Sequence, residues 1–108
     1  MVAAQYLRNK KYTILGAGYR CRFGEIDLIA SNREYIVFVE VKLRKYTAGY
    51  LPREAVTNDK RKRLLHAAKN FIYRSKTLLQ PRFDIIEITM NERQDLKDAD
   101  VNWIENAF

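Results

Sequence analysis

The order of apolar and polar positions predicts a β-hairpin in the first half of the chain. Two apolar runs rich in β-branched residues, Gly24–Ala30 and Tyr35–Lys42, flank the polar segment Ser31–Glu34. Such runs on either side of a short polar turn are typical of paired antiparallel strands. Charged residues interrupt both runs only at the ends far from the turn. We therefore expect a hairpin whose open end carries charge.

Five further segments complete the predicted secondary structure. Helical spacing predicts a short helix over Val2–Lys10 and a long helix that begins near Pro52 and continues to Ile72. Apolar runs predict strands at Tyr12–Tyr19, Arg82–Met90 and Val101–Ile104. The order α-β-β-β-α-β-β is typical of an α/β fold with a mixed central sheet flanked by helices. The length of 108 residues predicts a single domain over 1–108.

Two connections have distinctive composition. Residues 44–52 contain two tyrosines, two cations and a glycine, and we expect a loop that either contacts a substrate or is mobile. The acidic segment with Asp95, Asp98 and Asp100 is expected to be a surface loop, because it has neither the glycine nor the ligand spacing of a calcium site.

The charged residues of the hairpin are expected to meet on one side of the sheet. Side chains alternate between the two faces of a strand, and an even-residue turn preserves this pattern across the pair. The residues expected on one side are Glu25, Asp27 and Ile29 from the first strand and Ile36, Phe38, Glu40 and Lys42 from the second. One register places Asp27 opposite Glu40 and Glu25 opposite Lys42. A slip of two residues places Glu25 opposite Glu40 instead.

Facing carboxylates at a strand end are candidates for metal binding. Carboxylates opposite each other repel, and a hard divalent cation between them removes this cost. Mg²⁺, or Mn²⁺ in its place, favours one or two carboxylates together with water and phosphate oxygens. Lys42 follows Glu40 on the same face and could reach the same phosphate or an attacking water. The alternative is that these charges simply mark the end of a sheet in solvent.

The charge balance suits a polyanionic partner. The chain has 20 Lys and Arg against 13 Asp and Glu, a formal net charge of +7. Nucleic acid is the commonest polyanion that such proteins bind. A solvated basic surface without a partner is the alternative.

Single copies of cysteine and histidine exclude several classes of site. Cys21 and His66 are the only residues of their types, so no intrachain disulfide, thiolate zinc site or His-dependent triad is expected. The longest apolar run is well short of the roughly 18 residues of a membrane helix, and the first residues lack a signal-peptide pattern. We expect a cytoplasmic protein without membrane contact.

The charged hairpin also carries a family resemblance. Asp27 followed by Glu40-Val41-Lys42 resembles the PD-(D/E)XK signature of restriction-endonuclease-like nucleases, an acid on one strand and acid-X-lysine on the next. The wider sequence resembles the YraN family, which is considered similar to archaeal Holliday-junction resolvases. The matching segments are Ala4-Gln5-Tyr6-Leu7, Gly24 to Ala30, Val37 to Lys42, Glu54-Ala55-Val56, Arg82-Phe83-Asp84 and Ala107-Phe108.

The resemblance implies a restriction-endonuclease-like domain and roles for individual residues. It makes Asp27 and Glu40 metal ligands, with the Val41 carbonyl as a third. Lys42 would orient the hydrolytic water or stabilise charge on the phosphoryl group. Glu25 belongs to the YraN pattern and is assigned here as a carboxylate that either supports the metal ligands or binds a second metal. Related resolvases act as dimers, so a homodimer is expected as well.

Two positions depart from the related patterns. Ile26 stands where the signature usually has proline, a change that the signature tolerates. Related nucleases also place a glutamate on the first helix. By the usual Gly-x-x-Gly-Glu spacing, that glutamate would fall just before Met1. Either it lies upstream of Met1 or it is lost.

These observations lead to three hypotheses. The first is a Mg²⁺-dependent endonuclease that hydrolyses phosphodiester bonds in DNA, with branched or structured DNA as the expected substrate. The second is a non-catalytic nucleic-acid-binding module that retains the nuclease fold, and the third is an interaction subunit for an acidic protein. The first two predict cations that neutralise backbone phosphates. The candidates are Arg20, Arg22, Arg44, Lys45, Lys60, Arg61, Lys62 and Arg63.

Overall fold

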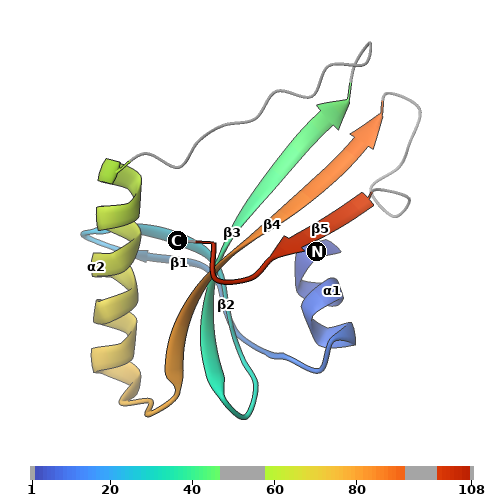
Figure 1. The fold of residues 1–108 in the computed structure, drawn as a ribbon. Coiled ribbons are helices and arrows are strands. Elements are labelled where there is room, and N and C mark those ends of the chain that lie inside the picture. The colour runs from blue at the N-terminus through green and yellow to red at the C-terminus, as the bar shows by residue number, and fades with distance from the viewer. Residues whose placement is uncertain (1, 47–57, 92–99, 108) are drawn as a thin grey trace.

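The structure is a computed structural model, and it describes residues 2–46, 58–91 and 100–107. Its helices and strands, in chain order, are α1 (Val2–Asn9), β1 (Thr13–Cys21), β2 (Gly24–Ser31), β3 (Tyr35–Tyr46), α2 (Asn58–Ser75), β4 (Gln80–Asn91) and β5 (Asp100–Ile104) (Figure 1). This order confirms the predicted sequence of elements.

The five described strands form one mixed sheet in the order β1-β2-β3-β4-β5. The β3–β4 pair is parallel, and the other three neighbouring pairs are antiparallel. Parallel neighbours require a crossover connection, and α2 lies within it. The described residues therefore form a small α/β domain with a mixed sheet and two helices, as the pattern of apolar residues predicts.

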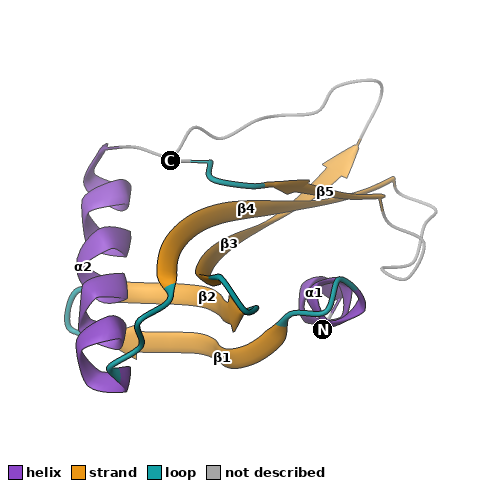
Figure 2. Ribbon diagram, turned by 60° about the horizontal axis from the view of Figure 1, so that its bottom comes forward, coloured by secondary structure: helices purple, strands orange, loops and turns teal. Residues whose placement is uncertain are grey.

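The two helices cover opposite faces of the sheet (Figure 2). On one face, Leu7 of α1 belongs to a buried cluster with Leu28 and Val37. On the other face, Leu64 of α2 packs in a second cluster with Phe38. Ala67 and Ala68 also face the sheet there, and their small side chains allow the helix to lie close to it. Each amphipathic helix thus buries its apolar side against strands that are buried on both faces.

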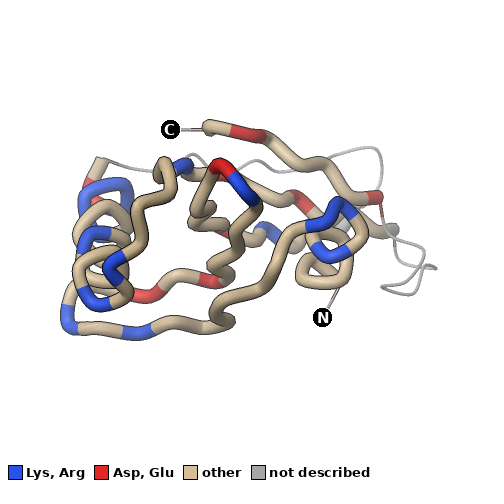
Figure 3. The backbone as a smooth tube through the Cα atoms, turned by 90° about the horizontal axis from the view of Figure 1, so that it is seen from below, with Lys and Arg blue, Asp and Glu red and all other residues tan. Residues whose placement is uncertain are grey.

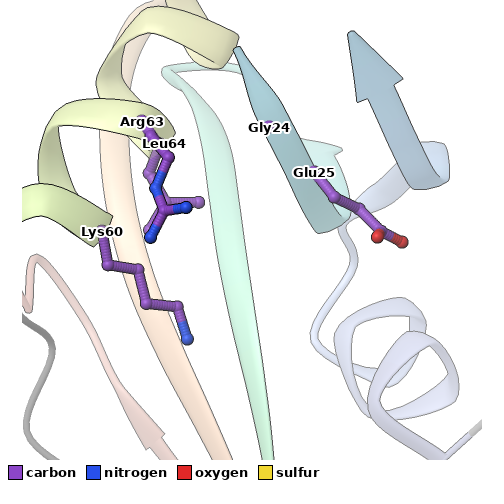
Figure 4. A pocket seen from close by; sticks show the side chains of 5 residues that line it. All are labelled: Gly24, Glu25, Lys60, Arg63 and Leu64. Carbon is purple, nitrogen blue, oxygen red and sulfur yellow. The ribbon is translucent and has the colours of Figure 1, made fainter. Parts of the chain in front are cut away.

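One expectation about the faces of β2 is wrong. Ile29 lies on the α2 side with Ile36 and Phe38, as predicted, but Ile26 also belongs to that cluster. Two residues three positions apart cannot share a face of a regular strand, so the alternation is interrupted between them. Burial of Ile26 beneath α2 consequently turns its neighbour Glu25 to the other side (Figure 4).

The ends of several elements differ from the prediction. β3 continues to Tyr46 because Arg44, Lys45 and Tyr46 pair with Thr89 to Asn91 of β4, so residues 44–46 are strand rather than loop. Asp100 pairs with Thr89 and begins β5, although it was expected in the acidic loop. The predicted helix start near Pro52 and the residues Asp95 and Asp98 lie outside the described part.

A buried carboxylate fastens the C-terminal segment to the sheet. Asp84 of β4 is fully buried, and its oxygens accept hydrogen bonds from Arg82, from Nε1 of Trp103 at 2.7 Å and from the amide of Asn106 at 2.9 Å. Arg82 also donates to the hydroxyl of Tyr12 at 3.0 Å. Burial acts to lower the pKa of Arg82, but the bonds to Asp84 and Tyr12 outweigh it and raise that pKa. This charged pair is fully hydrogen-bonded, so we assign it a structural role.

Candidate functional site

The two acids of the hairpin lie beside each other at the end of the β2–β3 ladder. The ladder pairs Leu28 with Val39, and the same register extended by one residue places Asp27 next to Glu40. Oδ2 of Asp27 accepts a hydrogen bond of 2.8 Å from the backbone amide of Val41. The carboxylate thus takes the place of a strand carbonyl where the ladder ends. This is the first of the two registers considered from the sequence.

Asp27 lies in surroundings that disfavour its charge. Burial raises the pKa of Asp27, and the charges of Glu40 and Glu25 raise it further. The hydrogen bond from Val41 and the charge of Lys60 act in the opposite direction. An acid that is harder to ionise because it is desolvated and beside another acid is typical of functional sites.

Glu40 is buried and neutralised by two lysines. Only 10% of its side chain is exposed, and its Oε1 lies 3.5 Å from Nζ of Lys42 and 2.6 Å from Nζ of Lys60. Lys42 comes from the same face of β3, whereas Lys60 reaches across from α2. Its hydrogen bond to Glu40 raises the pKa of Lys60. The site is therefore built from β2, β3 and α2.

The Val41 carbonyl lies on the side of β3 where a third ligand is needed. In an extended strand the amide and carbonyl of one residue point toward the same neighbouring strand. The Val41 amide points to Asp27 of β2, so its carbonyl faces the same side, beyond the last described β2–β3 pair. This position is compatible with the ligand role that the resemblance implies.

Glu25 lies apart from Glu40 and Lys42. Its side chain points away from α2, and Oε2 lies 3.4 Å from Nε of Arg20, its pairing partner on β1 (Figure 4). Both side chains of this pair are largely exposed. Glu25 thus lies outside the ion pairs of Glu40, although its charge acts on Asp27, and its assigned role stays a prediction.

The cations expected to contact phosphate are in different environments. Lys60 pairs with Glu40, as described above, and Arg44 forms a buried pair with Glu87 in which Nε lies 3.0 Å from Oε2. Arg22 is exposed, with its guanidinium over the ring of Phe23 at 4.8 Å. Arg61, Lys62 and Arg63 are exposed on α2. The side chain of Lys45 is outside the described part.

A cavity opens beside the acidic pair. It has a volume of about 350 Å³ and is lined by Gly24, Glu25, Lys60, Arg63 and Leu64 (Figure 4). Gly24 has a φ of +152°, a backbone conformation that residues with a side chain rarely adopt, so glycine suits this position beside Arg63 of α2. Lys and Arg positions follow α2 and the adjoining β1–β2 turn (Figure 3). The cavity therefore has a cationic border.

The donor groups fit an open magnesium site. Within residues 2–46, 58–91 and 100–107, no group of three or more His, Cys, Asp or Glu side chains could hold a metal ion. Two carboxylates, Asp27 and Glu40, and the Val41 carbonyl would supply part of a coordination shell. Mg²⁺ commonly completes such a shell with water and substrate phosphate. These donors are of the types that Mg²⁺ uses, and magnesium binding stays a prediction; Lys60 is the group that a cation would meet at Glu40.

Comparison with known sequences identifies the family. The sequence model described as "Uncharacterised protein family UPF0102" matches residues 1–88. This chain belongs to the UPF0102 family. The match includes all members of the candidate site, from Asp27 to Lys60, and supports the YraN resemblance seen in the sequence.

UPF0102 proteins from several bacteria resemble this chain along most of its length. One from Clostridium acetobutylicum is 45% identical over 105 residues, which cover 95% of this chain and 84% of that protein. Another from Caldanaerobacter subterraneus subsp. tengcongensis is 46% identical over 108 residues, 99% of this chain and 88% of its own length. A third from Nitrosomonas europaea is 36% identical over 106 residues, 98% and 86% of the two chains.

Sequence reasoning missed the position of one site residue. Lys60 was grouped with Arg61, Lys62 and Arg63 as a phosphate contact, but it pairs with Glu40. Four consecutive cations cover more than one turn of a helix, so one of them must face the sheet when the helix packs there. The sequence contains this signal but does not tell which cation it is.

A separate finding concerns membranes: no described helix of this UPF0102 protein is both long and apolar enough to cross one.

Proposed function

We propose that this UPF0102 protein is a divalent-metal-dependent DNA endonuclease with the PD-(D/E)XK, restriction-endonuclease-like architecture. The observation that carries the proposal is the convergence of Asp27, Glu40 and Lys42 at one strand end, with a cationic cavity beside them. The topology supports it, because both acids lie on a hairpin that the crossover helix α2 covers.

In the proposed hydrolysis of phosphodiester bonds, each residue of the site has a separate role. Asp27, Glu40 and the Val41 carbonyl would hold Mg²⁺ or Mn²⁺. When bound, such a cation supplies Lewis-acid stabilisation of phosphoryl charge and makes water a better nucleophile. Lys42 presents its ammonium beside Glu40, where it can donate hydrogen bonds to a phosphoryl oxygen or orient the attacking water. Its side chain is only 12% exposed, which fixes its position.

The surroundings of the site support DNA as the substrate. Arg63 borders the cavity, and Arg22, Arg61 and Lys62 are exposed on α2 and the adjoining β1–β2 turn. Cations spread over such a surface neutralise backbone phosphates without reading base sequence. We propose branched or structured DNA as the preferred substrate, with a homodimer making the paired cuts, as the resemblance to resolvases implies.

Cleavage by purified protein tests this function. We expect Mg²⁺ or Mn²⁺ to support cleavage of a synthetic four-way junction, tested beside linear duplex and single-stranded DNA. Asp27→Asn and Glu40→Gln should each reduce the single-turnover rate by at least about a hundredfold, because each removes a charged ligand. Glu34→Gln is the matched control, since Glu34 is an exposed acid at the other end of the hairpin. It should cleave like the unaltered protein.

Two further measurements separate loss of chemistry from loss of structure. Circular dichroism and thermal melting should show that the variants remain folded, and gel-shift assays should show that they still bind DNA. Undiminished cleavage by folded Asp27→Asn protein would overturn the assignment of the site. Cleavage that persists in excess EDTA would point to a contaminating nuclease.

One observation favours a second candidate function, a non-catalytic nucleic-acid-binding module. Glu40 already carries two lysine partners, and the described residues contain no group of three or more His, Cys, Asp or Glu that could hold a metal ion. This alternative predicts DNA binding that weakens with salt, does not depend on metal and leads to no cleavage. Metal-dependent cleavage that requires Asp27 would exclude it.

A further inference from the structure

Lys60 of α2 contacts the acidic pair directly. Nζ of Lys60 lies 2.6 Å from Oε1 of Glu40, the same oxygen that Lys42 approaches at 3.5 Å. In the proposed function, Glu40 is also a carboxylate that would hold the divalent cation. Lys60 and the cation would therefore compete for Glu40.

The charges of the group show why the competition matters. Asp27, Glu40, Lys42 and Lys60 together carry no net charge when all are ionised. A divalent cation added to this set would leave it at +2 in a half-buried place. If Lys60 leaves, the remainder carries +1, which a single phosphodiester neutralises. Exchange of Lys60 for the cation therefore prepares the site for one DNA phosphate.

Burial indicates which lysine can leave. The Lys42 side chain is 12% exposed and is held on β3 beside Glu40. The Lys60 side chain is 35% exposed, and Lys60 lies near the start of α2, on the border of the cavity. Its long flexible chain can swing toward solvent without disturbing the core. Arg63 and Gly24 line the same cavity, so a phosphate there would lie within reach of the released ammonium (Figure 4).

We propose that Lys60 is an exchangeable counter-ion: it neutralises Glu40 when no divalent cation is bound, and it transfers to a DNA phosphate when a cation takes its place. This inference rests on the proposed metal-dependent function. It assigns to α2 a regulatory residue outside the acid-X-lysine strand, one that links metal binding to DNA binding.

Direct metal binding tests the first half of the exchange. We would titrate Mn²⁺ into the protein without DNA and measure its affinity by calorimetry and by electron paramagnetic resonance. Removal of a competing ammonium should tighten binding, so Lys60→Met should bind Mn²⁺ at least about threefold more tightly than the unaltered protein. Lys69→Met is the matched control, because Lys69 is exposed further along α2 and its removal changes the net charge equally. Its Mn²⁺ affinity should stay within about 1.5-fold of the unaltered value.

A conservative variant separates exchange from damage to the fold. Lys60→Arg keeps a cation that can pair with Glu40, so its Mn²⁺ affinity should remain within about twofold of the unaltered value. If Lys60→Met binds Mn²⁺ but no more tightly than Lys69→Met does, the proposed exchange of Lys60 is contradicted, whereas the proposed metal site is not. If the unaltered protein and all variants fail to bind Mn²⁺, the proposed metal-dependent function fails with it.

DNA binding tests the second half. With Ca²⁺ in place of Mg²⁺ to prevent cleavage, Lys60→Met should weaken binding of a four-way junction by about threefold or more relative to Lys69→Met. In EDTA the two variants should bind alike, because Lys60 is then held by Glu40 in the unaltered protein. An equal loss in Ca²⁺ and in EDTA would show that Lys60 is an ordinary phosphate contact and would overturn the transfer.

Discussion

The backbone amide of Val41 donates a hydrogen bond of 2.8 Å to the carboxylate of Asp27, across the point where β2 and β3 stop pairing. This bond fixes one oxygen of Asp27 against β3 and leaves the other for a ligand. Because the donor is the backbone, the position of the carboxylate depends on the register of the hairpin rather than on a neighbouring side chain. An amide oxygen at this position can accept the same bond, so Asp27→Asn should preserve the hairpin.

The ionisation of Asp27 should lower stability as the pH rises. Burial raises its pKa above the ordinary value of 3.8, so the folded protein binds this proton more tightly than the unfolded chain does. At pH values between 3.8 and the raised pKa of Asp27, the free energy of unfolding therefore decreases with increasing pH. Asp27→Asn removes this titration. Relative to the unaltered protein, the variant should be more stable near neutral pH than at acidic pH.

Urea unfolding at a series of pH values checks this prediction. The difference in unfolding free energy between Asp27→Asn and the unaltered protein should grow as the pH rises through the window and then level off. Glu34→Gln provides the comparison for an exposed acid. A difference that does not change with pH would contradict the link between burial and the pKa of Asp27.

Arg63 should contribute to DNA affinity through charge alone. It is exposed at the border of the cavity, so Arg63→Gln should lower the affinity for all DNA structures to a similar extent. The slope of log affinity against log salt should decrease by about 1, the value for one lost phosphate contact. Arg33→Gln in the β2–β3 turn is the control and should leave the slope unchanged, since this turn is at the far end of the hairpin. Fluorescence anisotropy at several salt concentrations measures both slopes.

Arg44 should matter for stability, although the sequence suggested a phosphate contact. Its guanidinium and Glu87 are both about nine-tenths buried and lie 3.0 Å apart, and Asn102 also donates to Glu87. Arg44→Gln leaves a buried carboxylate without its charged partner and should lower the unfolding free energy by about 3 kcal/mol. The double variant Arg44→Met, Glu87→Met should recover much of this loss. A single variant with unchanged stability would show that the pair is not a structural contact.

Asp84 should be the most sensitive polar residue of the sheet. Asp84→Ala removes the acceptor for Arg82, Trp103 and the Asn106 amide in a fully buried position. We expect a loss of about 3–5 kcal/mol, measured by chemical denaturation and by Trp103 fluorescence. Asp100→Ala, at an exposed acid of the adjoining β5, should change stability by less than about 0.5 kcal/mol. Comparable losses in the two variants would contradict the structural role of Asp84.

Local patterns were sufficient to predict the order of elements but left two registers for the hairpin. Apolar runs and turn residues define the hairpin, and the structure has the register that places Asp27 next to Glu40. Ile29 and Phe38 therefore lie on the predicted face. The interruption at Ile26 could not be predicted in this way, because it depends on the docking of α2 onto β2. The direction of Glu25 was wrong for the same reason.

The long-range ion pairs could not be predicted from the sequence, for a related reason. Lys60 and Glu40, like Arg44 and Glu87, are joined only after the crossover has placed β4 and α2 against β3. Charge type alone does not tell a paired cation from a solvated one. The position of Asp84 was informative, since an acid within the apolar run Phe83–Ile88 is expected to be buried together with a charged or hydrogen-bonding partner. The alternation of side chains places Arg82 on the same face.

The parallel pairing of β3 with β4 also has a consequence for the order of folding. Asp27 and Glu40 are joined by a hairpin, the most local kind of strand pairing, whereas Lys60 reaches them only when the connection from β3 to β4 has closed. Closing a longer loop loses more chain entropy, so contacts of this kind form later in folding. During folding the two carboxylates therefore face each other with Lys42 of the same hairpin beside them, before Lys60 arrives. Under the proposed metal binding, a divalent cation present at that stage would favour the early hairpin by offsetting the repulsion between its two carboxylates.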